Sequence, residues 1–432
     1  MKKLLFALLF LWSSAFAISE ELCESLIDAG DYSKAVQVGQ ELIRRNPNSY
    51  GAHACLTVAY FQVGDFQKSL EHAQALERLA RNDDELSFAY NSLGLVYSSL
   101  GDLDTALMYH MRELSLSRKM GDRREEAVAL NNIAGIYENK GDYQKALEYY
   151  MRSLELKDDP RERAPTLNNI GNVYYKLGDY KNAERYLKQA IELSEKSGDF
   201  HGAGKGMLNL GDTYRRMKNY KLAEKLLSEG LERVKRVGDS YWEFGGYNNF
   251  TFLYFDMRDY KKSLEYAYMA YELGKKMGYD NSGVIVSTFV ILALRPELRA
   301  YLEELSKKDA EFLKAVEEIK DGYWRYVAYA GLTYVYFDMK DYKRSLEYAY
   351  MVYELAKKMS YDKSIPIGYI SAILLIKPEL KAYLEGLSKG DGELLKAIEE
   401  AKGWDGVKRL VAEANASQQQ KQAPKKGSQK RK

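Results

Sequence analysis

Apolar residues recur at helical spacing along most of this chain, and residues 130–156 show the pattern most clearly. In the first half of this stretch, residues spaced i, i+3, i+4 and i+7 fall on one face of an α-helix: Leu130, Ile133, Ala134 and Tyr137. The second half repeats the spacing at Ala146, Tyr150 and Ser153. Between the halves, Gly141 suits the left-handed end of one helix and Asp142 suits the N-cap of the next. The pattern predicts a helical hairpin that buries its apolar face by stacking on copies of itself.

Such copies follow one another along the chain. Small residues equivalent to Ala146 recur at intervals of 34 to 40 residues, with one final interval of 82 residues: Ala35, Ser69, Ala106, Ala146, Ala183, Ala223, Ser263 and Ser345. A small residue at this place lets the two helices of a hairpin lie close together. From Leu93 to Leu231 the period approaches 40 residues, and we place the additional residues in longer helices. The regular period predicts one elongated repeat array.

These repeats resemble the tetratricopeptide repeat. The resemblance rests on the pattern Leu-Gly-x-x-Tyr, followed by Gly-Asp-Tyr, Ala, an aromatic residue and Ala. The first part of it is complete at Leu93-Gly94-Leu95-Val96-Tyr97 and recurs with Ile170-Gly171 and with Leu210-Gly211. The long period is similar to that of kinesin light chains, Pins-type spindle adaptors and Gram-positive peptide-sensing regulators. The resemblance implies an all-α fold, a right-handed superhelical α-solenoid of stacked helix-turn-helix repeats.

The ends of the chain differ from the repeats in composition. Residues 1–17 have the basic start, apolar run and Ala-x-Ala end of a secretory signal peptide, which is too short for a comfortable membrane span. We therefore expect export to the periplasm or the extracellular space, with an uncleaved anchor as the alternative. The net charge is +2, and residues 417–432 hold six basic residues and no acidic one. The basic charge is thus concentrated at one end, which argues against a nucleic-acid-binding body.

The sequence between these ends divides into three blocks. We expect a repeat array over residues 18–239 and two duplicated blocks over residues 240–321 and 322–416, followed by a disordered basic tail over 417–432. Residues 256–320 match residues 338–402 at an offset of 82. Each block should contain one repeat, then a helical hairpin that lacks the signature residues, then a short helix. Residues 404–414 could cover the open end of the stack.

The most suggestive chemistry is a row of asparagines just before the Leu-Gly position. Asn132, Asn169, Asn209 and Asn249 occupy one repeat position, and Asn131, Asn168 and Asn248 stand one residue earlier. Asparagine is a mediocre helix former, so its recurrence needs a reason. The resemblance implies that these helices line the inner wall of the superhelix, where the resembled adaptors use such asparagines to bind partner peptides. The alternative is that the amides bond between neighbouring helices and fix the stack.

Further polar residues lie beside this row on the same expected face. They predict a mixed, mostly basic centre of the groove: Asn172, Tyr175, Lys176, Asp212, Arg215 and Arg216. Beyond them, aromatic residues predict a more apolar wall: Phe252, Phe255, Tyr334 and Phe337. An extended partner with acidic and then hydrophobic residues would suit this gradient. Cys23 and Cys55 are the two cysteines, and they are either a disulfide of an oxidising compartment or two small buried residues.

No motif for catalysis is present in the sequence. The four histidines, His53, His72, His110 and His201, are scattered without metal-binding spacing. The glycine-rich residues 202–206 follow a predicted helix rather than a strand, so we interpret them as a connector rather than a phosphate loop. We expect no enzyme, no cofactor and no metal.

The expected partner is a protein or peptide, with no small-molecule substrate and no nucleic acid. A membrane contact would involve only the basic tail. Self-association through the first repeat or the duplicated blocks stays open. The alternative function is a passive spacer whose basic tail binds an anionic polymer or surface.

Overall fold

The computed structural model describes residues 18–307, 309–317 and 322–412. The expected signal peptide and basic tail lie outside these residues. The chain divides between Val237 and Gly238 into two compact units, each of which is considered by itself. The described residues contain helices and no strands, so the expected all-α repeat solenoid is confirmed.

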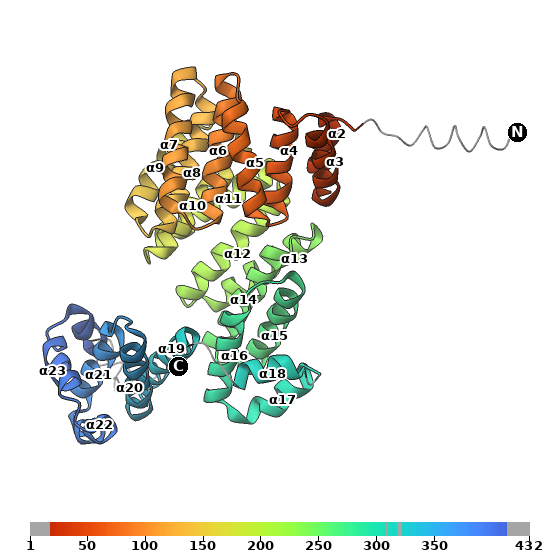
Figure 1. Cartoon of the computed structure of the whole chain (residues 1–432). Helices are drawn as coiled ribbons and strands as arrows, with labels where there is room; N and C mark the ends of the chain where they lie inside the picture. Colours follow the sequence, from red (N-terminus) through yellow and green to blue (C-terminus); the bar gives the residue numbers. More distant parts are fainter. Residues whose placement is uncertain (1–17, 308, 318–321, 413–432) are drawn as a thin grey trace, which may run out of the picture. The chain divides into compact units, whose positions relative to one another are not determined.

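The first unit is a series of helical hairpins, each formed by an even-numbered helix and the odd-numbered helix that follows it (Figure 1). In chain order the helices are α2 (Glu20–Asp28), α3 (Tyr32–Arg45), α4 (Tyr50–Gln62), α5 (Phe66–Leu79), α6 (Asp83–Ser99), α7 (Leu103–Met120), α8 (Arg123–Asn139), α9 (Tyr143–Glu155), α10 (Pro160–Lys176), α11 (Tyr180–Lys196), α12 (Phe200–Arg216) and α13 (Tyr220–Arg236). Helices α3 to α5 have 13 or 14 residues, whereas α10 to α13 have 17 each. The longer period is therefore built from longer helices, as expected.

Gly-Asp steps set where these helices end and begin. Gly121 takes a left-handed φ of 71° at the end of α7, which costs glycine little because it has no Cβ. The next residue, Asp122, accepts hydrogen bonds from the backbone N–H groups of Arg124 and Glu125 and so caps α8. Asp142 caps α9 in the same way, through the N–H of Lys145. The turn chemistry expected from the sequence is confirmed at these steps.

The small residues on the second helices lie at the tightest contacts of the hairpins. All eight of them, from Ala35 to Ser345, have an exposed fraction of 0%. In several hairpins a tyrosine three residues further along the second helix stacks on a tyrosine of the first helix, with ring centroids 5.4 Å apart in both Tyr137–Tyr149 and Tyr174–Tyr186. The high tyrosine content is thus largely explained by packing between paired helices.

Three hairpins replace the usual Gly/Ala and Ala pair with threonine and serine. Ser69 Oγ donates a hydrogen bond to the Thr57 carbonyl oxygen at 2.8 Å, and Thr57 Oγ1 donates to the carbonyl of its own helix four residues earlier. The same arrangement occurs in Thr251–Ser263 and in Thr333–Ser345. Every hydroxyl buried at these positions therefore has an acceptor, which removes the cost of burying it.

The second unit contains the duplicated blocks. The first block comprises α14 (Ser240–Asp256), α15 (Tyr260–Met277), α16 (Ser282–Leu294), η1 (Pro296–Leu298), α17 (Arg299–Leu305) and α18 (Ala310–Glu317). The second comprises α19 (Gly322–Asp338), α20 (Tyr342–Met359), α21 (Ser364–Ile376), η2 (Pro378–Leu380), α22 (Lys381–Ser388) and α23 (Gly392–Ala401). Among the described residues no helix is both long and apolar enough to span a membrane.

A terminal helix covers the end of the second block. Residues 405–412 are helical, and Val407 is buried against the cluster formed by α21 and α23. Leu410 and Val411 pack on the same cluster. In the first block the corresponding helix α16 is instead packed against α19, through Val286 and Ala328. In the second block the C-terminal helix therefore covers apolar surface. In the first block the equivalent surface is covered by the repeat that follows.

The glycine-rich residues 202–206 are not a connector, and that expectation was wrong. They lie inside α12, where the glycines allow a close crossing with α13. A Cβ at Gly230 would come within 2.8 Å of the Gly204 carbonyl oxygen and 3.0 Å of Leu208 Cγ. Packing between these two helices therefore overrides the low helix propensity of glycine.

This crossing predicts that Gly230→Ala destabilises the protein. Overpacking should lower the free energy of unfolding by about 1–3 kcal/mol, even though alanine is the better helix former by about 1 kcal/mol. Urea unfolding followed by circular dichroism measures the change. The matched control is Gly245→Ala in α14, where an added Cβ has no neighbour within 4 Å and should stabilise slightly. Equal effects of the two substitutions would contradict the close crossing.

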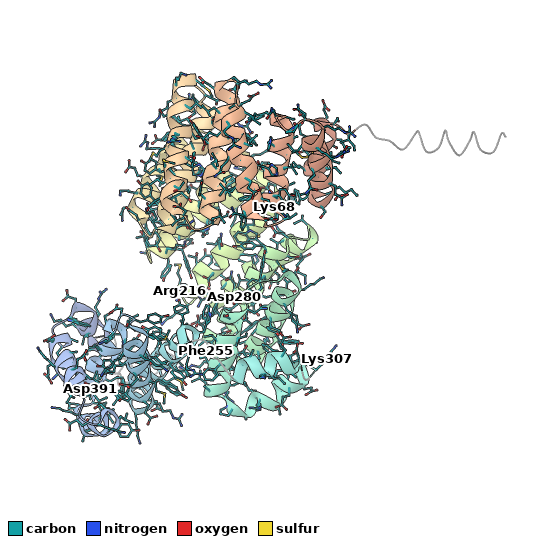
Figure 2. The ribbon with its side chains drawn as sticks, in the orientation of Figure 1. Lys68, Arg216, Phe255, Asp280, Lys307 and Asp391 are labelled. Carbon is teal, nitrogen blue, oxygen red and sulfur yellow. A yellow bond between two sulfur atoms is a disulfide. The ribbon has the colours of Figure 1, made fainter. Side chains whose placement is uncertain are left out.

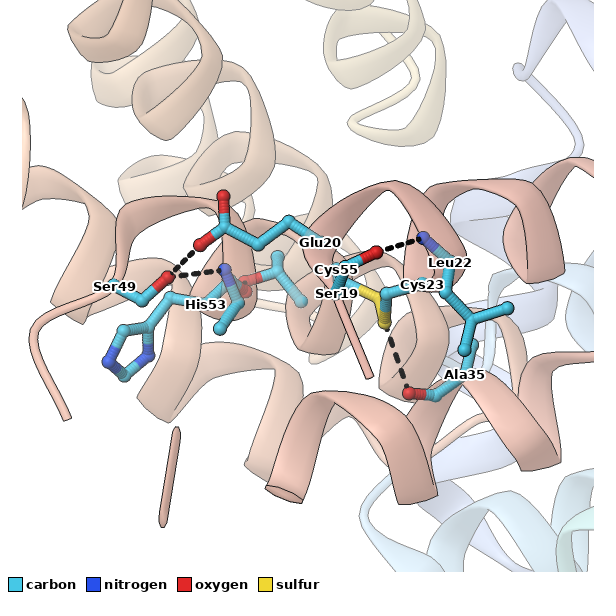
Figure 3. Close-up of a disulfide and its surroundings, with 10 residues drawn as sticks. Ser19, Glu20, Leu22, Cys23, Ala35, Ser49, His53 and Cys55 are labelled. Atoms are coloured by element: carbon cyan, nitrogen blue, oxygen red, sulfur yellow. Dashed lines mark hydrogen bonds between the residues drawn. A yellow bond between two sulfur atoms is a disulfide. The ribbon is translucent and has the colours of Figure 1, made fainter. Parts of the chain in front are cut away.

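A disulfide holds the first three helices together. Cys23 of α2 is bonded to Cys55 of α4, with their Cα atoms 6.1 Å apart (Figure 3). Of the two readings left open by the sequence, the structure has the disulfide. Helix α2 has only nine residues, so it has little apolar surface of its own to hold it in place. The bond compensates for this short opening helix.

Replacing both cysteines by alanine should therefore loosen the N-terminal hairpin. For two cysteines separated by 32 residues, the loss of chain constraint is worth roughly 3–4 kcal/mol. Hydrogen exchange resolved by mass spectrometry should show faster exchange in α2 to α4. Helices α10 to α13 should be unchanged, because a repeat contacts mainly its neighbours. Unchanged exchange in α2 would show that the bond adds nothing to local stability.

Candidate functional site

The predicted asparagines of the first unit lie on consecutive first helices. Asn131 and Asn132 are on α8, Asn168 and Asn169 on α10, and Asn209 on α12. All five are half-buried. Asn248 and Asn249 are on α14, in the second unit. The structure thus brings together the members of the row that lie in the first unit.

Most of these amides are bonded between neighbouring repeats. Asn132 Nδ2 donates to Asn91 Oδ1 at 3.1 Å, which joins α8 to α6. Asn209 Nδ2 donates to Asn168 Oδ1 at 3.0 Å, which joins α12 to α10. These two contacts support the alternative that the amides fix the stack. Sequence reasoning missed Asn91, whose only signal is its place one residue before the position of the row.

The contact between α8 and α10 is made differently. Thr166 Oγ1 donates to Asn131 Oδ1 at 3.3 Å, and the buried Lys157 donates to Thr166 Oγ1 at 2.8 Å. Burial lowers the pKa of Lys157. By the pattern of the other two contacts, Asn169 would donate to Asn131 Oδ1. That oxygen instead accepts the hydrogen bond from the Thr166 hydroxyl.

Asn169 is consequently the exception in the row. Within the described part of the chain, neither its amide nor that of Asn172, one turn further along α10, makes a side-chain hydrogen bond. Each carboxamide offers two N–H donors and an acceptor oxygen. Helix α10 therefore presents two half-buried amides whose hydrogen-bonding groups are available to a ligand.

The charged residues beside the row give this face less positive charge than expected, because some of the cations are paired with carboxylates. Lys176 Nζ lies 2.8 Å from Glu138 Oε1, and buried Arg215 lies 2.6 Å from Asp212 Oδ1 through its Nε. The expectation of a mostly basic centre was wrong to this extent, because partners on the same face neutralise two of its cations. Arg216, labelled in Figure 2, is exposed, and its guanidinium carbon lies 6.0 Å from the centre of the Tyr175 ring.

Tyr175 connects these charges to α10. Burial, the charge of Asp212 and a hydrogen bond to Asp212 together raise the pKa of Tyr175 to about 12, against a smaller lowering by Arg215 and Arg216. The neutral phenol is thus held next to a carboxylate that is itself paired with Arg215. Tyr175, Asp212, Arg215 and Arg216 form one cluster, which we call the Tyr175 cluster, at the ends of α10 and α12.

In the second unit the row and the aromatic wall are arranged differently. Asn248 Nδ2 donates to the Phe244 carbonyl of its own helix at 3.1 Å, so this amide satisfies local backbone. Phe252 and Tyr334 are exposed by 45% and 59%, whereas Phe337 is buried and stacks edge-on with Tyr342 and Tyr369. The expected apolar wall is therefore exposed at some positions and part of the core at others.

Two of the four histidines meet in the structure, although the sequence has no metal-binding spacing between them. His53 and His72 place their Nδ1 atoms 2.9 Å apart, and buried His110 Nδ1 lies 2.8 Å from Glu113 Oε2. The hairpin brings the first two together although 19 residues separate them. Among the described residues no group of three or more His, Cys, Asp or Glu side chains is arranged to hold a metal ion.

Comparison with known proteins agrees with this architecture. Residues 84–159 and 162–236 match the tetratricopeptide repeat family, so this part of the chain is built of tetratricopeptide repeats. Proteins of this family are generally non-enzymatic scaffolds. No curated protein sequence matches the chain significantly.

Solved structures with a similar fold include the apo form of RapI, with a TM-score of 0.57 and 13% identity over 79% of this chain and 97% of that one. A Rap protein complexed with Competence and Sporulation Factor gives a TM-score of 0.54 at 13% identity, with the same coverage. A STAND protein with a tetratricopeptide repeat sensor from Pyrococcus horikoshii gives 0.52 at 16% identity, over 70% of this chain and 48% of that one. At these identities the likeness concerns the fold alone.

The Tyr175 cluster predicts a pH dependence at high pH. The folded-state pKa of Tyr175, about 12, lies above the ordinary value of 10.0. The contribution of the neutral phenol to stability is therefore complete below about pH 10 and is lost as the pH rises towards about 12. Asp212→Asn should lower the pKa of Tyr175, because it removes the carboxylate and leaves the arginine charges unopposed.

Carbon-13 NMR of the tyrosine Cζ atoms during a pH titration measures this pKa, with Tyr175→Phe to assign the signal. Glu192→Gln is the control, because Glu192 of α11 is paired with Lys196 on its own helix. It should leave Tyr175 unchanged. An unaltered or higher pKa in Asp212→Asn would show that Asp212 does not act on Tyr175.

Proposed function

We propose that this protein is an exported, non-enzymatic scaffold that binds an extended segment of a partner protein along the first helices α8, α10 and α12. The observation that carries the proposal is the pair of amides on α10, Asn169 and Asn172, whose side chains have no hydrogen-bond partner among the described residues. The neighbouring amides of the row are already joined to one another. Binding is therefore centred on α10.

An amide is suited to an extended peptide because it can donate to a main-chain carbonyl and accept from a main-chain N–H at once. Each such hydrogen bond contributes about 0.5–1.5 kcal/mol net. This recognition does not depend on the partner's side chains. Selectivity would come from the adjoining Tyr175 cluster, where Arg216 is exposed and the other charges are paired.

The fold supports an interaction role. The tetratricopeptide repeat architecture suggests a protein–protein interaction scaffold. One similar structure, at 13% identity, is a Rap protein complexed with Competence and Sporulation Factor. A protein of similar fold thus binds another molecule, which supports a binding role for this fold.

Export is supported by two features of this chain. Residues 1–17 have the composition of a secretory signal peptide. The Cys23–Cys55 disulfide is the kind of bond that persists in oxidising compartments.

The double variant Asn169→Ala/Asn172→Ala tests the binding proposal. A peptide is first selected on the wild-type protein from a displayed library of extended segments, and its affinity is measured by calorimetry. Loss of two to four hydrogen bonds should weaken binding by roughly 10-fold or more. The melting temperature should stay close to that of the wild type, because no intramolecular bond is removed.

Asn248→Ala is the matched control, because this amide bonds its own helix, and it should bind the peptide normally. Undiminished affinity of the double variant would refute the role of α10. A chain ending at Ala416 separates the tail from the groove. If this chain loses retention on an anionic polymer or the cell envelope while the asparagine double variant keeps it, the alternative of a passive spacer with a binding tail is supported.

A further inference from the structure

His53 and His72 contact each other, and this contact has no part in the proposed peptide binding. His53 is on α4 and His72 on α5, with Nδ1 atoms 2.9 Å apart. The ring centroids are 5.1 Å apart, close to the largest separation that this nitrogen contact allows. Each Nδ1 therefore points almost directly at the other ring, and the two lone-pair axes nearly coincide.

A second contact decides which nitrogen of His53 carries the proton. Nε2 of His53 lies 3.0 Å from the Pro47 carbonyl oxygen, which can only accept a hydrogen bond. His53 Nε2 is therefore protonated, and in the neutral ring Nδ1 carries a lone pair that accepts the hydrogen bond from His72 Nδ1–H. This is how a metal-binding histidine is normally held: its other ring N–H is donated to a carbonyl or carboxylate.

The two histidines also depart from the repeat pattern. The His72 ring stacks on Tyr60 with centroids 5.7 Å apart, and at the same place other hairpins stack Tyr109 on Tyr97 or Tyr149 on Tyr137. The position equivalent to His53 holds Leu130 in α8 and Leu167 in α10. Tyrosine and leucine thus satisfy the packing at these two positions elsewhere in the chain, so packing alone does not require histidine.

We propose that His53 and His72 bind one monovalent copper ion in linear, two-coordinate geometry through their Nδ1 atoms. Imidazole nitrogen is a good ligand for copper, and Cu(I) is satisfied by two ligands placed opposite one another. A structural zinc site needs four ligands, and among the described residues no third His, Cys, Asp or Glu joins this pair.

Binding requires a small opening of the pair and no net loss of a proton. With metal–nitrogen bonds of about 2 Å, the two Nδ1 atoms must separate by roughly 1 Å. His72 is half-buried, so its ring can move towards solvent, while His53 stays bonded to Pro47. The proton on His72 Nδ1 leaves to water, and Nε2 of the same ring takes one up.

The surroundings keep both rings available to the ion. The two cysteines are joined to each other and offer no competing thiolate. Figure 3 shows His53 on α4, the helix that this disulfide attaches to α2.

Anaerobic titration of the purified protein with Cu(I) tests the site, using the chelator bicinchoninate as a coloured competitor. The wild type should take up one ion per chain more than His72→Tyr does. That variant installs the tyrosine found in the other hairpins and should fold normally, which circular dichroism verifies. His201→Ala, which removes a histidine elsewhere, should bind like the wild type.

X-ray absorption of the loaded wild type should show the edge of a two-coordinate Cu(I) ion with nitrogen ligands. Equal uptake by His72→Tyr, or no uptake by the wild type, would overturn the proposal and leave the pair as a hydrogen bond within the hairpin. Sulfur ligands in the absorption spectrum would equally overturn it, because they would place the ion at methionines.

Discussion

Close packing of the two helices of each hairpin is the constraint on which the rest of the structure depends. The second helices approach the first at residues no larger than alanine or serine, and these residues have no exposed surface. The close approach places the aromatic residues three positions later in register, so that tyrosines stack across the pair. It also aligns the hairpins so that a side chain on one first helix meets the equivalent turn of the next. The polar contacts between repeats follow from this alignment.

Polar groups inside such a stack need partners, and the chain satisfies them in two ways. Where threonine and serine replace smaller residues, their hydroxyls bond to backbone carbonyls within the hairpin. Where asparagines face one another, they bond between hairpins. The contact of α8 with α10 breaks this second pattern, because Thr166 occupies the oxygen of Asn131. Two of the amides of α10, Asn169 and Asn172, therefore form no side-chain hydrogen bond among the described residues, and the proposed site is based on these two.

Ion pairs within the stack also determine which charges of the proposed site a ligand would meet. Arg215 and Lys176 are positive in the sequence, but each is paired with a carboxylate on the same face. A ligand would therefore meet the exposed Arg216, which has no ion-pair partner among the described residues, and a mostly neutral surface around it. The pair His53–His72 is separate from this site and lies between α4, the helix that the disulfide joins to α2, and α5.

The sequence by itself determined the class of fold, the hairpins and their ends. Local rules suffice for these, because the apolar period, the Gly-Asp steps and the small residues at fixed positions act within one hairpin. It also placed the asparagines on one repeat position. Only the tertiary structure decided which of these asparagines form hydrogen bonds within the protein. Their partners Asn91 and Thr166 belong to neighbouring hairpins, so these contacts depend on the register between repeats.

The same reason explains the expectations that were wrong or left open. Glycines 202–206 read as a connector from local propensity, yet they are helical because α12 and α13 must cross closely. The histidines looked scattered because 19 residues separate two that the hairpin brings within 2.9 Å. The sequence left the pairing of Cys23 with Cys55 open, because the distance between their α-carbons depends on how α2 packs against α4. Local periodicity specifies each helix, and only packing between helices specifies which side chains meet.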